Sequence, residues 1–167
     1  MANAMDVADS IIVNAQEVGH PVSNLQLQKI MYFLNAIHLV DDNGTPLIDD
    51  DHFEKWDYGP VIRSVYSEYS IHGANTITEP ARHTILAQDN QTGRFRIQYH
   101  KFNPNNLTQE ENRFIETNLN RFLGFDPFFL VNESHLEPQW REKEYPIYDN
   151  QRTINFYTQP QNRFWEN

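Results

Sequence analysis

Apolar residues recur at helical spacing near the N-terminus, between Ala4 and Val18. A helix repeats about every 3.6 residues, so side chains three and four positions apart lie on one face. Gly19 and Pro21 follow directly, and such residues commonly end a helix. The pattern therefore predicts a first helix whose buried face consists of Ala4, Val7, Ala8, Ile11, Ala15 and Val18.

A second helical pattern begins immediately after this stop. Ser23 can cap a helix start, and Gln26 stands three residues later, as in a capping box. Val22 can pack on Leu27 as a hydrophobic staple, and "DDNG" at Asp41–Gly44 ends the pattern. This predicted helix directs five apolar side chains toward the core: Leu27, Ile30, Met31, Leu34 and Ile37.

The stretch "FEKWDYGPVIRSVY", Phe53–Tyr66, combines aromatic residues with a Gly-Pro step. We expect a short extended segment over Phe53–Tyr58 that enters a corner at Gly59. Pro60 suits the first turn of a helix, because its missing N–H is not needed there. The sequence therefore predicts a third helix that starts at Pro60, is closed by Gly73 and buries the stripe Val61, Val65 and Tyr69.

The middle of the chain has a different period. Phe95, Ile97 and Tyr99 alternate with polar residues, which indicates a strand. The preceding "QDNQTG" is typical of a turn, and Ile85–Leu86 suits a partner strand. A β-hairpin is predicted here.

The last third returns to helical spacing. Thr108 and Glu111 form a capping box that opens a helix ending at Gly124, and short helical pieces are predicted at Phe128–Val131 and after Pro138. The predicted fold class is mainly α, a compact multi-helix domain with a small β-hairpin (α+β). We expect residues 1–145 to form this domain and residues 146–167 to form a C-terminal extension that is either partly docked or loose.

Composition fits one domain with a core, since 39% of the 167 residues are hydrophobic. The absence of cysteine excludes disulfides and thiolate chemistry. The start "MANAMDVADS" lacks a basic region, and no apolar run approaches the roughly 20 residues that span a bilayer. We therefore expect a cytoplasmic protein with no membrane partner.

The net charge of −10 is unevenly distributed. Residues 1–60 carry ten acids and two bases, and residues 61–167 carry thirteen acids and eleven bases. An acidic surface repels the phosphate backbone, so nucleic acid is not an expected partner. The acids suit a basic protein partner, and the alternative is that they only keep the surface solvated.

Candidate reactive chemistry is sparse. The seven histidines are scattered, and none pairs with another at helical spacing to form a metal-binding face. "DDDHFE" at Asp49–Glu54 contains only fragments of a calcium-loop pattern. We predict no catalytic residues, no metal and no cofactor. The alternatives are a metal-assisted hydrolase that uses Asp49–His52 with a distant histidine, and a DNA-binding regulator whose first two helices mimic a helix-turn-helix.

Three segments carry recognisable motifs in a fixed order. They are "VSNLQLQKIMYFLNAIHL" at Val22–Leu39, "FEKWDYGPVIRSVY" at Phe53–Tyr66, and "LTQEE" at Leu107–Glu111 followed by "ESHLEPQW" at Glu133–Trp140. Together they resemble the signatures of the Panacea antitoxin domain family, which includes GepA-like phage-associated proteins and a SocA-type proteolytic adaptor.

This resemblance implies a mostly helical domain that acts by binding protein and is not an enzyme. Its partner would be a cognate toxin, neutralised by direct binding or by delivery to a protease. The motif residues have structural roles in this interpretation: Gln28, Lys29, Tyr32, Tyr58, Gly59, Pro60, Val61, Tyr66, His135 and Trp140.

Two alternatives concern these motifs. Lys29 and Tyr32 share a helix face, so either Lys29 extends over Tyr32 toward solvent, or the pair joins an acid such as Glu54 or Asp57 in a polar cluster. The aromatic corner forms either a packed junction between helices or an exposed contact for a partner. We expect the toxin to meet the acidic segment and its neighbouring tryptophan, at Asp49, Asp50, Asp51, Glu54 and Trp56.

Overall fold

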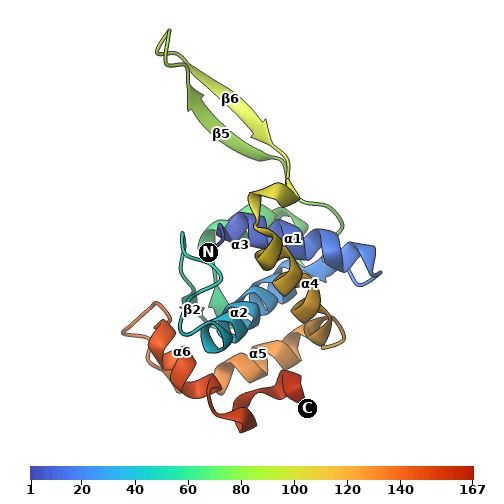
Figure 1. Cartoon of the computed structure of the whole chain (residues 1–167), viewed down its shortest axis with the longest axis vertical. Coiled ribbons are helices and arrows are strands. Elements are labelled where there is room, and N and C mark those ends of the chain that lie inside the picture. Colours follow the sequence, from blue (N-terminus) through green and yellow to red (C-terminus); the bar gives the residue numbers. More distant parts are fainter.

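The computed structural model describes residues 1–167, except for the side chain of Ile85. The chain forms six α-helices, which are joined by short antiparallel strands, 3₁₀ helices and loops (Figure 1). The predicted fold class, mainly α with a small β-hairpin, is confirmed. The helices are α1 (Ala4–Glu17), α2 (Asn24–Asp41), α3 (Arg63–Tyr69), α4 (Gln109–Leu123), α5 (Pro127–His135) and α6 (Asn150–Tyr157).

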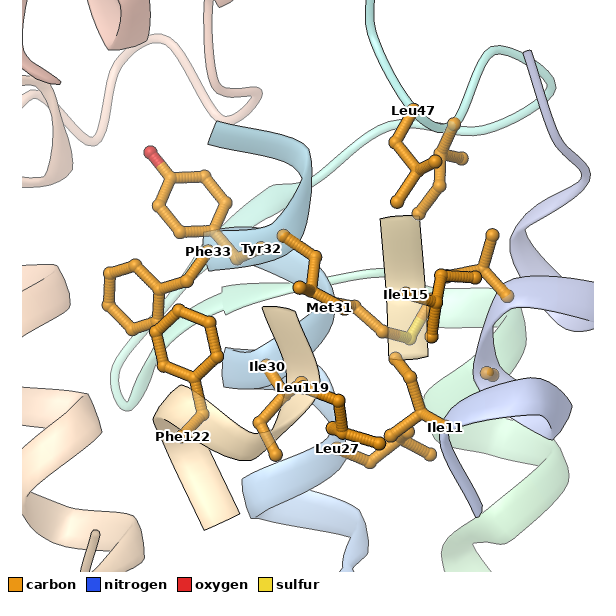
Figure 2. Close-up of a cluster of buried hydrophobic side chains, with 14 of the residues drawn as sticks. Ile11, Leu27, Ile30, Met31, Tyr32, Phe33, Leu47, Ile115, Leu119 and Phe122 are labelled. Carbon is orange, nitrogen blue, oxygen red and sulfur yellow. The ribbon is translucent and has the colours of Figure 1, made fainter. Parts of the chain in front are cut away.

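Helix α2 lies at the centre of the body, and α1, α4, α5 and α6 pack against it (Figure 1). Fourteen of its eighteen residues are buried, so it lacks the exposed face that a DNA-recognition helix presents. Figure 2 shows its side chains among those of α1 and α4, with Met31 near Ile115 and Phe33 near Phe122. Burying side chains of this size stabilises a fold by about 1.5 to 3 kcal/mol each. None of the described helices combines the length and the apolar composition needed to cross a membrane.

Local capping explains where the helices start. The Ser23 hydroxyl accepts from the Gln26 amide at 3.3 Å, at the start of α2. At the start of α4, Thr108 and Glu111 bond each other's backbone amides in both directions, which confirms the predicted capping box. Such caps satisfy amides that have no partner inside the helix.

The strands form three separate two-stranded sheets. Strand β1 (Val22–Ser23) pairs with β4 (Thr76–Ile77), and β2 (Glu54–Trp56) pairs with β3 (Gly59–Val61). The predicted β-hairpin is present as β5 (His83–Gln88) and β6 (Phe95–His100), and it projects away from the helical body (Figure 1).

The prediction that Pro60 begins a helix is wrong. Pro60 lies within β3, opposite Lys55 of β2, and α3 starts only at Arg63. The fixed φ of proline is compatible with extended backbone as well as with a helix start. Bonds from α2 to the backbone of Pro60 and Ile62 hold this segment extended, so the helix is delayed.

The C-terminal segment is also structured. Helix α5 continues to His135, well beyond the predicted piece, and a 3₁₀ helix at Pro138–Arg141 follows. After α6, short 3₁₀ helices at Pro160–Asn162 and Phe164–Glu166 fold back on the body. Trp165 is buried and lies 5.9 Å from the ring of Phe33.

Candidate functional site

Two polar side chains of α2 form hydrogen bonds with the backbone at the Gly-Pro step and just after it. The Lys29 Nζ donates to the carbonyl of Pro60 at 2.7 Å, and the Gln28 side-chain oxygen accepts from the Ile62 amide at 3.0 Å. Asn24 donates to the carbonyl of Tyr66 at 3.0 Å. The first two motifs are therefore joined by hydrogen bonds, and these bonds hold the chain on its course from β3 into α3.

Gly59 is required for this arrangement for two reasons. Its φ is +89°, a conformation that residues with a Cβ rarely adopt. A Cβ at this position would also overlap the Ser134 hydroxyl oxygen and touch the Lys29 side chain. The glycine thus lets α2, β3 and α5 meet at one point.

The Lys29 ammonium is fully buried beneath this junction. Burial lowers the pKa of Lys29 to about 7, because the charged form loses its hydration. The Lys29 ammonium donates its hydrogen bond to the carbonyl of Pro60 rather than to Glu54 or Asp57. Lys29 therefore neither extends to solvent nor joins the proposed acid cluster. Its side chain instead connects α2 to β3 inside the protein.

Tyr32 belongs to a different buried polar cluster. Its hydroxyl donates to the carboxylate of Glu137 and lies 3.2 Å from the Thr153 hydroxyl. Thr153 and the Gln139 amide also donate to Glu137. Burial raises the pKa of Glu137, while these bonds act in the opposite direction. The cluster joins α2, the 3₁₀ helix after Pro138 and α6, so it ties the C-terminal segment to the body.

Sequence reasoning missed Glu137 and Thr153. The only local signal was the position of Glu137 inside "ESHLEPQW", directly before a proline. A glutamate in such a segment is normally exposed. The buried partners that make it structural lie on elements distant in sequence, 105 positions away in the case of Tyr32.

His135 and Trp140 stack on each other beside β2, with ring centroids 3.5 Å apart. The Trp140 indole donates to the carbonyl of Trp56 at 2.9 Å, and the Lys143 ammonium lies 4.3 Å from the Trp140 ring. Burial lowers the pKa of His135, which favours the neutral imidazole. These contacts hold the third motif against the β2–β3 turn.

The place where α2, β3 and α5 meet around Gly59 is here named the motif junction. A groove of about 590 Å³ opens on its solvent side. Tyr58 on one side is 60% exposed and Tyr66 is 37% exposed, although both belong to the motifs. The Trp56 ring meets Tyr66 edge-on at 4.9 Å, and Tyr58 meets the exposed Phe128 at 6.0 Å. The groove walls also include three further motif residues: Asn24, Gln28 and Val61.

The predicted protein-binding acids are distributed over several contacts. Asp50 accepts from the amide of Ala4 at 2.8 Å and so supports the start of α1. Asp51 accepts from the Ser64 hydroxyl at 2.6 Å. Of the five predicted contact residues, only Trp56 lines the groove.

Glu54 forms a bidentate ion pair with Arg63 and accepts from the Trp56 indole at 2.7 Å. The Arg63 guanidinium is the main reason that the pKa of Glu54 is lowered. Arg63 also lies over the Trp56 ring, 5.0 Å from its centroid. Glu54 therefore orients the tryptophan at the edge of the groove.

Within the part of the chain that the structure describes, no group of three or more His, Asp and Glu side chains is positioned to hold a metal ion. The groove presents the aromatic side chains of Trp56, Tyr58 and Tyr66, together with polar side chains that include Asp57 and Ser70. Its chemistry suits contact with another polypeptide.

Comparison with known proteins agrees with these features. Antitoxin SocA of Caulobacter vibrioides (strain NA1000 / CB15N) is 39% identical over 79 residues, which cover 47% of this chain and 41% of that protein. The chain thus matches less than half the length of this curated relative, and no solved structure matches it significantly. The family model described as "Antitoxin SocA-like, Panacea domain" matches residues 27–141, which is more than half of the chain. This range includes most of the first motif and all of the second and third motifs. The chain belongs to the SocA-like Panacea antitoxin family.

Proposed function

We propose that this protein is a cytoplasmic antitoxin that binds a cognate toxin protein in the groove and performs no catalytic step itself. The observation that carries the proposal is the exposure of Tyr58 and Tyr66 over a junction whose polar side chains Gln28 and Lys29 are buried. Tyrosine and tryptophan dominate protein interfaces because they offer large apolar area with few rotatable bonds. A pre-formed groove also lowers the entropy cost of binding.

The charge of the segment before the groove suggests the character of the toxin. Asp49 and Asp57 are exposed, and Asp57 lies on the groove itself. Complementary charge raises association rates, so this segment favours a basic toxin surface. Asp50, Asp51 and Glu54 support the fold through their hydrogen bonds, and Trp56 provides the direct contact.

Co-expression tests the proposal. The gene beside this one is expressed alone and then with this protein, and we expect growth arrest in the first case and rescue in the second. Changing Tyr58→Ser together with Tyr66→Ser should abolish rescue. Tyr145→Ser is the control, since Tyr145 is about as exposed as Tyr58 but lies outside the groove. Rescue by the groove variant at wild-type level would refute the groove as the toxin site.

The fate of the toxin distinguishes the two modes of neutralisation. If the protein blocks the toxin directly, toxin abundance stays constant while growth recovers. If it presents the toxin to a protease, toxin abundance falls, and rescue disappears in a strain that lacks the protease. Immunoblotting of the toxin after translation is stopped measures the difference.

Charge steering is tested separately by Asp49→Asn with Asp57→Asn. We expect several-fold slower toxin association at low salt and little change at high salt, because salt screens exposed charges. Glu144→Gln removes an exposed charge outside the groove and serves as the control. An association rate identical to that of the wild type at low salt would exclude steering by these two residues.

A further inference from the structure

The β5–β6 hairpin is the part of the molecule that is least integrated into the body. Residues 82–101, here named the arm, extend into solvent beyond α1 and α3 (Figure 1). In the described sheets the two strands pair only with each other, from His83 opposite His100 to Gln88 opposite Phe95. A lone two-stranded hairpin is only marginally stable in water, so further contacts would stabilise it.

One face of the arm carries four exposed apolar side chains alongside Thr84 and Gln88. Phe95, Ile97 and Tyr99 alternate along β6 and therefore point to the same side, and Leu86 pairs directly opposite Ile97. Their side chains are exposed by 63%, 59%, 70% and 65% respectively. A contiguous apolar surface of this kind marks an interaction site.

The base of the arm is firmly held. The buried carboxylate of Asp9 in α1 accepts from the Tyr69 hydroxyl and contacts His83 Nε2 at 2.6 Å. The Tyr69 hydroxyl also accepts from the amide of Ala81 at 3.0 Å. These bonds tie the base of the arm to α1 and α3.

Charge identifies the kind of surface that the arm fits. The arm contains Arg82, Arg94, Arg96 and Lys101 against the single acid Asp89, a net charge of +3. Because the whole chain has a net charge of −10, the residues outside the arm carry −13. The arm is thus complementary in charge to the body of its own protein, but it points away from that body (Figure 1).

We propose that the arm docks on the acidic body of a second copy of this chain, and that two copies exchange arms in a two-fold symmetric dimer. In this arrangement each apolar face is covered and each basic arm meets acidic surface. Pairing of two arms with each other would instead bring like charges together. Leu86 and Ile97 occupy the centre of the face, and aliphatic side chains favour a protein surface over nucleic-acid bases. The inference does not depend on the identity of the toxin.

Sedimentation equilibrium of the purified full chain tests this inference. We expect a dimer at low salt that dissociates as salt is added, since its charges are complementary. Leu86→Thr with Ile97→Thr should raise the dimer dissociation constant about tenfold or more, as expected for loss of central apolar contacts. Gln98→Thr, on the opposite face of β6, should leave the constant unchanged. A wild type that stays monomeric at every concentration, or a dimer insensitive to the Leu86 and Ile97 changes, would overturn the proposal.

A distance measurement identifies the mode of association. Because the chain has no cysteine, Gln91→Cys places a single spin label at the exposed tip of the arm. Arms that reach over opposite bodies separate the two tips, so double electron–electron resonance should give a long label-to-label distance. A short distance, from two arms stacked on each other, would contradict docking on the body even if a dimer forms.

Discussion

The motif junction and the arm reverse the usual distribution of side chains in opposite ways. At the junction the polar groups of Gln28 and Lys29 are buried, as is Glu137 in the separate cluster around Tyr32, whereas on the arm Leu86 and Ile97 lie in water. The buried polar groups find their hydrogen-bond partners within the chain. The apolar side chains Leu86 and Ile97 of the arm, in contrast, stay exposed to solvent. Buried polar groups thus mark where the fold is complete, and exposed apolar groups mark where another polypeptide completes it.

The strongest test of this contrast is Gly59→Ala. The added Cβ combines an unfavourable positive φ with overlap at Ser134, so we expect the free energy of unfolding to fall by roughly 3 to 5 kcal/mol. Urea denaturation followed by circular dichroism measures it. Gly73→Ala is the matched control, because Gly73 also has a positive φ but has no atom within 4 Å of the new Cβ. If both variants lose the same free energy of unfolding, the overlap with Ser134 does not contribute to the loss at Gly59.

Removing the buried carboxylate should have the next largest effect. Glu137→Ala leaves the Tyr32 hydroxyl and the Gln139 amide without their main acceptor, at a cost of about 2 to 4 kcal/mol in unfolding free energy. Glu137→Gln should restore part of this loss, because its amide oxygen still accepts. The exposed Glu144→Ala controls for loss of a carboxylate and should change little. Wild-type stability of Glu137→Ala would show that the cluster does not anchor the C-terminal segment.

The buried ammonium predicts a specific pH dependence. Lys29 has a folded-state pKa of about 7, below its ordinary value of 10.5, so between these pH values the unfolded chain binds more protons than the folded one. Stability should therefore rise with pH in this window, by up to about 1.4 kcal/mol per pH unit, and this contribution is absent below it.

Lys29→Met removes the titrating group while keeping a similar length. The difference in unfolding free energy between the wild type and this variant should follow pH from 7 to 10. Comparing the two proteins cancels the contribution of other groups, including the buried tyrosines. A difference that stays constant across this range would show that Lys29 does not titrate there.

The smallest effect is expected on the arm. At protein concentrations that keep the chain monomeric, Leu86→Thr should change the free energy of unfolding by less than about 0.5 kcal/mol, because the side chain is already exposed. Thermal melting of dilute samples measures this. A loss comparable to that of Glu137→Ala would mean that the apolar face of the arm supports the monomer itself, and the contrast between the two regions would disappear.

Sequence reasoning worked where structure is determined by neighbouring residues. The capping box of Thr108 and Glu111 and the alternation of Phe95, Ile97 and Tyr99 each produced the expected element. It failed at Pro60, because the conformation there is set by Gln28 and Lys29, about thirty positions away. Nothing in the local pattern distinguishes a proline that starts a helix from one in an extended strand.

The site shows the same division. Trp56 was expected to contact a partner, and it lines the groove. Tyr58 and Tyr66 were assigned structural roles from their motifs, and only the folded chain reveals that their rings reach solvent. Aromatic residues serve both cores and interfaces, so their identity alone does not say which side of a surface they occupy.

By itself, the sequence determined helices α1, α2 and α4, the hairpin, the absence of thiol chemistry and the family motifs, because each depends on residues close together in the chain. Tertiary structure alone decided that Lys29 and Glu137 are internal, that Gly59 is a point of contact between three elements, and that the arm carries its apolar face into solvent. The physical reason is that burial and hydrogen-bond pairing are properties of the space between elements. A one-dimensional pattern specifies each element, but the packing of α2 against β3, α5 and α6 specifies what each side chain meets.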